Sequence, residues 1–201
     1  PLPSPGQIGI RPGMSINIPN ASLEIEGNLT DRDKEYIDAA LKNDMHKYFA
    51  SYVEKETDIT NILELDKEAI IGAKIESKKG FDFVENVYLK YKDKVQLILA
   101  RGDLYMEIDQ PHQILNSSKK IVLSYKNAIA ASRIFVSLKD VEKMPACNDI
   151  TDLAYLMQCG YRRFLLGDDI CLKKESVKSA IGLFKAIVEE YENGNILYNR
   201  K

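Results

Sequence analysis

The chain has 201 residues, which at a usual size of about 150 residues per domain predicts one domain rather than two. Its residues are 45% hydrophobic and 29% charged, a composition typical of globular proteins that excludes disordered and collagen-like chains. The net charge of −2 excludes a dedicated nucleic-acid binder, and the lack of any long apolar run excludes an integral membrane protein.

The cysteines and histidines limit the possible chemistry. Cys147, Cys159 and Cys171 are odd in number and form no C-x-x-C pair, so neither a disulfide framework nor a zinc knuckle fits. We therefore expect a reducing, cytoplasmic setting. His46 and His112 have no partner at ligand spacing, which speaks against histidine-based metal or triad chemistry.

The first residues form an extended segment. The chain opens at Pro1 without an initiator methionine, so we expect the protein to include upstream sequence. Within residues 11–19, Met14, Ile16 and Ile18 alternate with smaller or polar residues, which predicts a strand or a linker.

Helical periodicity begins at Thr30, a favourable N-cap that is followed by Asp31 and Asp33 at the positive end of the helix. From there apolar strands alternate with amphipathic helices. The expected strands are residues 48–53, 69–75, 95–100, 133–137 and 162–166. The expected helices after the first are residues 58–65, 81–90, 113–130, 149–158 and 175–191. This alternation predicts an α/β fold with a parallel sheet, and either an open doubly wound sheet or part of a barrel fits it.

Two of the expected strands end in charged residues. Lys74 and Glu76 share one side of the second strand by a period of two, and Arg101 and Asp103 do the same across Gly102 after the third. Two carboxylates from neighbouring strand ends form a site suited to Mg²⁺, beside which Lys74 and Arg101 would receive an anionic substrate. The alternative is that these residues are solvated charges in turns.

At these strand ends the sequence resembles the pyruvate kinase family. The matching elements are residues 73–77 (family K-I-E-N), 100–104 (A-R-G-D-L), 13–19 (G-V-N-L-P), 49–53 (F-A-S-F-V) and 151–154 (S-D-V-A-N). The resemblance covers residues 8–190 in order and implies a (β/α)8 TIM barrel, of which this chain supplies strands four to eight. Residues 1–20 would be a linker or the return from a lid domain, and residues 21–201 the C-terminal part of the barrel.

The resemblance also implies roles for individual residues. Glu76 and Asp103 would bind Mg²⁺ or Mn²⁺, while any K⁺ would have ligands outside this chain. Lys74 would stabilise the charge on the transferring phosphoryl group and on the enolate. The amides of Gly102 and Asp103, together with Arg101, would bind the substrate carboxylate.

Several positions depart from the family pattern. Tyr105 stands where the family has glycine, and Glu54 stands where an arginine is expected. Ser137 is the nearest match to the threonine of the family's A-T-Q-M element, which assists proton transfer, and Asp168 falls in the replacement of its L-S-G-E-T element. The first three barrel strands, the lid and the C-terminal domain are absent from this chain, so upstream sequence or a partner chain would complete the barrel.

These observations leave three functions open. The first is a divergent pyruvate kinase that transfers a phosphoryl group from phosphoenolpyruvate to ADP, giving pyruvate and ATP, in a homo-oligomer. The second is a degenerate pyruvate-kinase-like binding or interaction protein. The third is an Mg²⁺-enolate lyase or aldolase on a related barrel.

Overall fold

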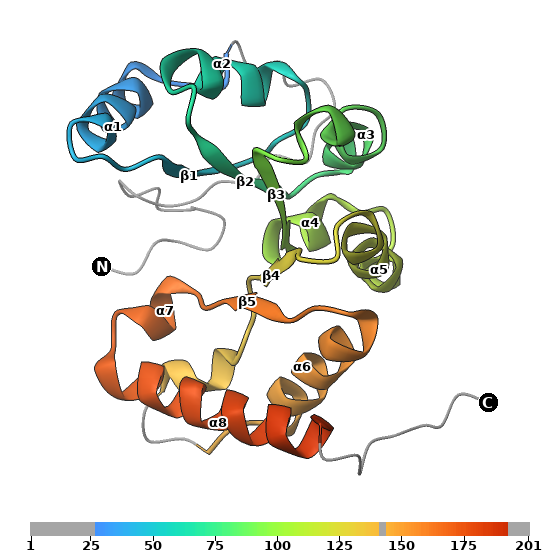
Figure 1. The fold of residues 1–201 in the computed structure, drawn as a ribbon. Coiled ribbons are helices and arrows are strands. Elements are labelled where there is room, and N and C mark those ends of the chain that lie inside the picture. The colour runs from blue at the N-terminus through green and yellow to red at the C-terminus, as the bar shows by residue number, and fades with distance from the viewer. Residues whose placement is uncertain (1–26, 141–143, 193–201) are drawn as a thin grey trace, which may run out of the picture.

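A computed structural model describes residues 27–140 and 144–192 as helices packed around a parallel sheet (Figure 1). The five strands pair in chain order and all run parallel. They are β1 (Lys47–Ala50), β2 (Ile70–Ile75), β3 (Val95–Ala100), β4 (Ile129–Ala131) and β5 (Arg163–Leu165). The α-helices are α1 (Asp31–Leu41), α2 (Thr57–Leu65), α3 (Lys78–Asn86), α4 (Arg101–Glu107), α5 (Ile114–Ser124), α6 (Cys147–Cys159), α7 (Asp168–Cys171) and α8 (Lys174–Glu192). The 3₁₀ helices are η1 (Tyr88–Tyr91), η2 (Pro111–Gln113) and η3 (Val136–Lys139).

The two faces of the sheet have different environments. Ile71, Ala73 and Ile75 of β2 are fully buried in the main hydrophobic core. On the opposite face, a Cβ atom on Gly72 would lie 2.6 Å from the ring of Phe49 and 2.8 Å from the side chain of Ile98. A larger residue at this position would force the Phe49 ring and the Ile98 side chain to shift, because the Phe49 ring crosses over the backbone of the neighbouring strand.

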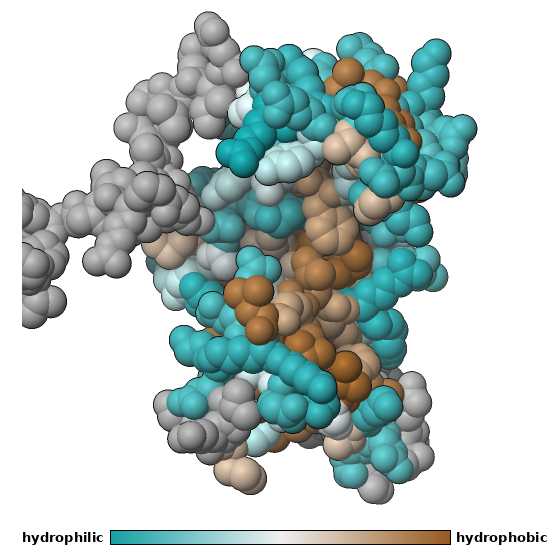
Figure 2. Space-filling view, turned by 90° about the vertical axis from the view of Figure 1, so that its left-hand side faces the viewer, coloured by the Kyte–Doolittle hydropathy of each residue, from teal (hydrophilic) through white to brown (hydrophobic). Residues whose placement is uncertain are grey.

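Among the described residues, neither edge of the sheet pairs with a further strand. Within the described residues, β1 pairs only with β2, and β5 pairs only with β4. Figure 2 shows a strip of hydrophobic surface, bordered by hydrophilic residues, on the side of the molecule that faces left in Figure 1. Phe49 lies beside Gly72, on the face of the sheet opposite the main hydrophobic core, and is 61% exposed. The described part of the chain therefore leaves apolar surface that a closed barrel would bury.

A hydrogen-bonded cluster joins the amino-terminal ends of β1 and β2. Asp66 is 3% exposed, and its Oδ2 lies 2.9 Å from His46 Nδ1 and accepts a hydrogen bond from the Tyr48 hydroxyl at 2.9 Å. The hydrogen bond to Asp66 raises the pKa of His46 above its ordinary value. His46 therefore has a structural partner distant in sequence.

The α/β class and most of the predicted elements are confirmed. The strand expected at residues 133–137 is wrong, because Arg133 and Phe135 have φ values of 58° and 56° and Val136 begins η3. The helix expected at residues 113–130 ends instead at Ser124, and β4 follows it. The segment at residues 11–19 and the division at residue 20 lie outside the described residues.

The long C-terminal helix α8 packs on the strand before it, β5. The rings of Phe184 on α8 and Phe164 on β5 lie 5.5 Å apart in an edge-on arrangement. Ala180 and Ile187 are buried, whereas Ile181 is 48% exposed and lies at the margin of this contact.

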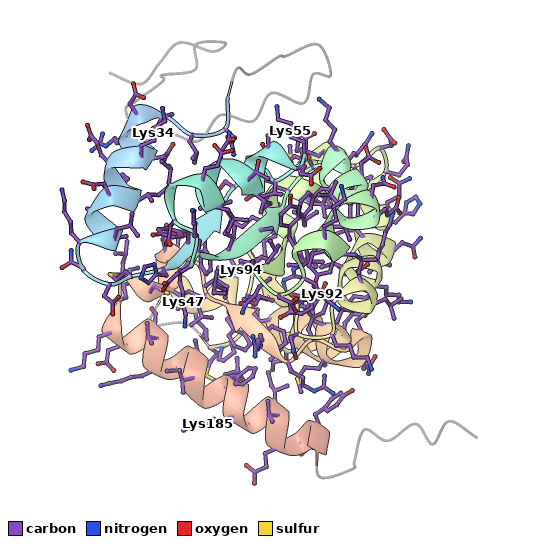
Figure 3. All side chains as sticks on the ribbon, turned by 45° about the horizontal axis from the view of Figure 1, so that its top comes forward. Lys34, Lys47, Lys55, Lys92, Lys94 and Lys185 are labelled. Carbon is purple, nitrogen blue, oxygen red and sulfur yellow. The ribbon has the colours of Figure 1, made fainter. Side chains whose placement is uncertain are left out.

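The lysine side chains come from several separate helices and strands. The lysines labelled in Figure 3 include Lys34 on α1, Lys47 on β1 and Lys185 on α8. Among the described residues, no helix combines the length and the apolar composition that a bilayer crossing requires.

Candidate functional site

Lys74 and Glu76 lie in contact at the carboxyl end of β2. Lys74 Nζ is 2.7 Å from Glu76 Oε1 and donates a hydrogen bond to Ser51 Oγ, which follows β1, at 3.1 Å. The Glu76 side chain is 1% exposed, and its Oε2 accepts a hydrogen bond from the Tyr52 amide at 2.6 Å. The ends of β1 and β2 thus hold a buried carboxylate whose direct cationic neighbour is a partly exposed lysine.

Further carboxylates surround the phenol of Tyr52. Burial and the negative charges of Asp103, Glu76, Glu107 and Glu54 raise its pKa to about 12. The negative charges of the two predicted metal ligands, Glu76 and Asp103, thus both contribute to the raised pKa of Tyr52. Glu76 directly follows β2, and Asp103 lies in the first turn of α4, which directly follows the neighbouring strand β3.

Asp103 and Gly102 belong to a helix rather than to an extended strand end. The helix α4 begins at Arg101, directly after β3, so the expectation that Arg101 and Asp103 share one side of a strand is wrong. Gly102 lies close to Ser132, which follows β4, because a Cβ atom on it would be 3.3 Å from Ser132 Cβ. The first turn of α4 is therefore packed against the end of the next strand.

Arg101 is a buried structural residue. Its Nη1 and Nη2 atoms donate to the two carboxylate oxygens of Asp152 on α6 at 2.6 and 2.7 Å, and Nη2 also donates to the Ser132 carbonyl at 3.0 Å. The Arg101 residue is 8% exposed. Both terminal nitrogens thus have protein partners, whereas Nε has none within the described residues.

Ser137 likewise has a structural environment. Its hydroxyl donates to Asp149 Oδ2 and accepts a hydrogen bond from the Ala146 amide at 3.0 Å, so it ties η3 to the start of α6. The hydroxyl that directly follows β4 belongs instead to Ser132, with φ of 64°. Ser132, rather than Ser137, is therefore the serine that lies at the carboxyl end of β4.

Two other residues that differ from the family pattern also contact neighbouring side chains. Tyr105 has an ordinary helical backbone on α4, and the Arg133 guanidinium lies 5.0 Å from the centre of its ring. Glu54 accepts a hydrogen bond from Ser77, the N-cap of α3. Two residues that differ from the family pattern, Tyr105 and Glu54, are thus integrated into local packing.

The donor set fits a hard divalent cation. Magnesium in phosphate sites is usually bound by one or two carboxylates, with water and substrate oxygens completing its coordination. Glu76 and Asp103 supply two carboxylates, and Asp103 forms no hydrogen bond or ion pair within the described residues. No cluster of three or more metal-binding side chains occurs in residues 27–140 and 144–192. Any cation here would therefore depend on substrate or on the rest of the protein.

The parallel strands, their covering helices and the charged carboxyl ends define a protein of the (β/α)-barrel type. The model of the family "Pyruvate kinase, barrel domain" matches residues 4–166, and the chain therefore belongs to the pyruvate kinase family.

Individual pyruvate kinases extend this match over most of the chain. That of Thermotoga maritima is 30% identical over 194 residues, which are 93% of this chain and 40% of the relative. That of Lactobacillus delbrueckii subsp. bulgaricus is 31% identical over 157 residues, 74% of this chain and 26% of the relative. That of Thermoplasma acidophilum is 22% identical over 191 residues, 92% of this chain and 34% of the relative. The chain spans two fifths or less of the length of these relatives.

Proposed function

We propose that the protein containing this chain is a divergent pyruvate kinase, in which β1 to β5 are barrel strands four to eight. The observation that carries the proposal is the contact of Lys74 with Glu76, with Asp103 in the first turn of the helix that follows the next strand. These three residues match the family's K-I-E and A-R-G-D-L elements. The reaction would transfer the phosphoryl group of phosphoenolpyruvate to ADP in a cytoplasmic homo-oligomer, with the other barrel strands supplied from outside this chain.

Each residue would have a distinct task in this reaction. Glu76 and Asp103 would hold Mg²⁺ or Mn²⁺, which when bound supplies positive charge to the substrate oxygens. The Lys74 ammonium would stabilise negative charge on the transferring phosphoryl group and on the enolate oxygen. Ser132, rather than Ser137, would present a hydroxyl to the enolate from the end of β4.

The substrate carboxylate would be bound by backbone groups. The Gly102 and Asp103 amides lie in the first turn of α4, where amides have no acceptor within the helix. Arg101 would act indirectly, because its ion pair with Asp152 fixes the start of α4 against α6. Any K⁺ would be bound by residues beyond this chain.

One observation favours the second candidate, a degenerate binding protein. The Tyr105 ring stands where the family has glycine, and Arg133 covers it. If this pair narrows the substrate pocket, binding of a cation or of a 2-oxoacid would persist without turnover.

A coupled assay with lactate dehydrogenase on the full-length protein tests the proposal. Lys74→Met should lower kcat by a factor of hundreds, since loss of one preorganised charge partner costs about 3–4 kcal/mol of transition-state stabilisation. Lys92→Met, which changes an exposed lysine before β3, is the matched control and should leave kcat unchanged. Robust turnover in Lys74→Met would refute the role of Lys74.

The same assay separates the two candidates. Absence of turnover in the wild type, with recovery in Tyr105→Gly, would establish the degenerate protein. Turnover in the wild type that Tyr105→Gly does not increase would exclude it.

A further inference from the structure

The segments that lead into β1 to β4 form one continuous surface. Because these strands are parallel and pair in chain order, their amino-terminal ends share one edge of the sheet. Neighbouring segments are joined by the contact of His46 with Asp66, by the hydrogen bond from Lys94 Nζ to the Lys67 carbonyl at 3.2 Å, and by the rings of Tyr88 and Tyr125, whose centres are 5.9 Å apart. We call residues 42–47, 65–69, 89–94 and 123–128 the amino-terminal face.

Each segment of the amino-terminal face carries an exposed lysine that forms no ion pair within the described residues. These lysines are Lys47, Lys67, Lys92 and Lys126. The face as a whole has seven lysines and four acidic residues, and thus a net charge of +3 in a chain whose net charge is −2. Two of its carboxylates, those of Asp44 and Glu68, lie 3.4 and 3.9 Å from Nε2 of His46. The amino-terminal face is therefore a locally basic surface on an acidic protein.

Each segment also exposes one large aliphatic side chain. The exposed fractions are 59% for Met45, 43% for Leu65, 69% for Leu89 and 79% for Leu123. Each of these residues lies two or three positions before the unpaired lysine of its segment. Single exposed apolar residues are ordinary on protein surfaces, but here one recurs beside a lysine in four adjacent segments. At a strand spacing of about 4.8 Å, the row of four spans roughly 15 Å.

The combination of lysines and aliphatic side chains selects among anionic partners. On a lipid surface, lysines are attracted to anionic headgroups while leucine and methionine side chains enter the boundary between headgroups and acyl chains. A single-stranded nucleic acid would also attract the lysines, but its bases stack on exposed aromatic rings. Tyr91 and Tyr125 of the amino-terminal face are only partly exposed, and its exposed apolar residues are aliphatic. The chemistry of the face therefore favours lipid.

We propose that the amino-terminal face binds anionic membrane surfaces peripherally. Its four unpaired lysines would contact lipid headgroups, and Leu89 and Leu123, the most exposed of its aliphatic residues, would enter the headgroup boundary. Lys74 and Glu76 lie at the opposite, carboxyl end of the strands. The inference is therefore independent of the proposed catalytic activity.

Sedimentation of the full-length protein with lipid vesicles tests the proposal. One set of vesicles contains phosphatidylcholine alone, and the other contains phosphatidylcholine mixed with phosphatidylserine. We expect saturable binding to the phosphatidylserine vesicles, at least about tenfold weaker binding to the neutral vesicles, and a loss of binding as added salt screens the charges. No binding to phosphatidylserine vesicles, or equal binding to both kinds, would overturn the proposal.

Charge variants locate the contact. The double variant Lys92→Glu with Lys126→Glu should weaken binding to phosphatidylserine vesicles at least about tenfold. The control double variant, Lys119→Glu with Lys185→Glu, makes the same change in net charge at exposed positions of α5 and α8, outside the amino-terminal face (Lys185 is labelled in Figure 3). It should weaken binding less than about threefold. An equal loss in the two double variants would show that only net charge matters and would refute this location.

Apolar variants separate lipid from nucleic acid. Leu89→Gln with Leu123→Gln leaves the charge unchanged and should weaken binding to phosphatidylserine vesicles about fivefold or more, because two exposed aliphatic groups no longer enter the bilayer surface. Circular dichroism would verify that each variant keeps the wild-type fold. Unchanged vesicle binding in this variant would overturn the proposal. Binding of polyuridylate without binding of vesicles would also overturn it and would assign the face to nucleic acid.

Discussion

The ion pair between Arg101 and Asp152 makes a sharp stability prediction. In Asp152→Ala, Arg101 would keep only the Ser132 carbonyl as an acceptor, and its Nε has no hydrogen-bond partner within the described residues even in the wild type. Breaking a buried ion pair from one side typically costs about 3–5 kcal/mol. The Asp152 side chain is 33% exposed, so water reduces this penalty, and we expect a loss of about 2–3 kcal/mol in the free energy of unfolding.

The reciprocal variant should be milder. Arg101→Met removes the buried charge and retains an apolar side chain of similar length, while the remaining Asp152 carboxylate can be solvated. We expect a loss of less than about 1.5 kcal/mol. Urea denaturation of the full-length protein, followed by circular dichroism, measures both values. The structural role of Arg101 is refuted if Asp152→Ala changes the unfolding free energy by less than about 0.5 kcal/mol, or if Arg101→Met is the more damaging change.

The remaining predictions address metal binding, proton transfer, pH and association. Asp103→Ala should abolish metal-dependent phosphoenolpyruvate binding, and unchanged Mn²⁺ affinity by calorimetry would contradict the metal site. Ser132→Ala should lower the rate of pyruvate enolisation, measured as exchange of methyl protons with deuterated water, more than Ser137→Ala does; equal rates would contradict that assignment. The His46 pKa is raised, so its pair with Asp66 should stabilise the fold fully below pH 6.5 and lose this effect as the pH rises through the raised value. Thermal melts of wild type and His46→Gln should therefore converge at alkaline pH, and a constant difference would disprove this linkage. The isolated chain should aggregate or dimerise through its open strand edges, whereas a monodisperse monomer in light scattering would show that these edges are covered.

The sequence predicts the strands that are longest and mostly buried. β2 and β3 are six residues each and mainly apolar, and the structure reproduces their predicted ends to within one residue. β4 has only three residues, two of them alanine, so its composition continues the pattern of the preceding helix. The apolar residues Ile134 and Phe135 then suggest a strand where the backbone is in a turn. Short strands are specified by their neighbours in the sheet, which local periodicity does not record.

The residues of the candidate site also differ in how far the local sequence predicts them. Lys74 and Glu76 were found because both follow one apolar run at a spacing of two residues. The role of Arg101 could not be found in this way, because its partner Asp152 lies on another helix 51 residues later. The role proposed for Ser132 could not be predicted either, because it depends on the correct end of β4. A turn signal at residues 125–127, between α5 and β4, could have revealed that end.

The loop after β4 bears on any attempt to make this protein more thermostable. Ser132, Arg133 and Phe135 all have left-handed backbone conformations, each of which costs a residue with a side chain about 1–2 kcal/mol. Glycine at Arg133 would relieve part of this strain, and a search for stabilising substitutions would therefore select it. The same substitution would remove the cation that lies over the Tyr105 ring. Optimising this loop for heat resistance would thus select against the contact between the loop and α4.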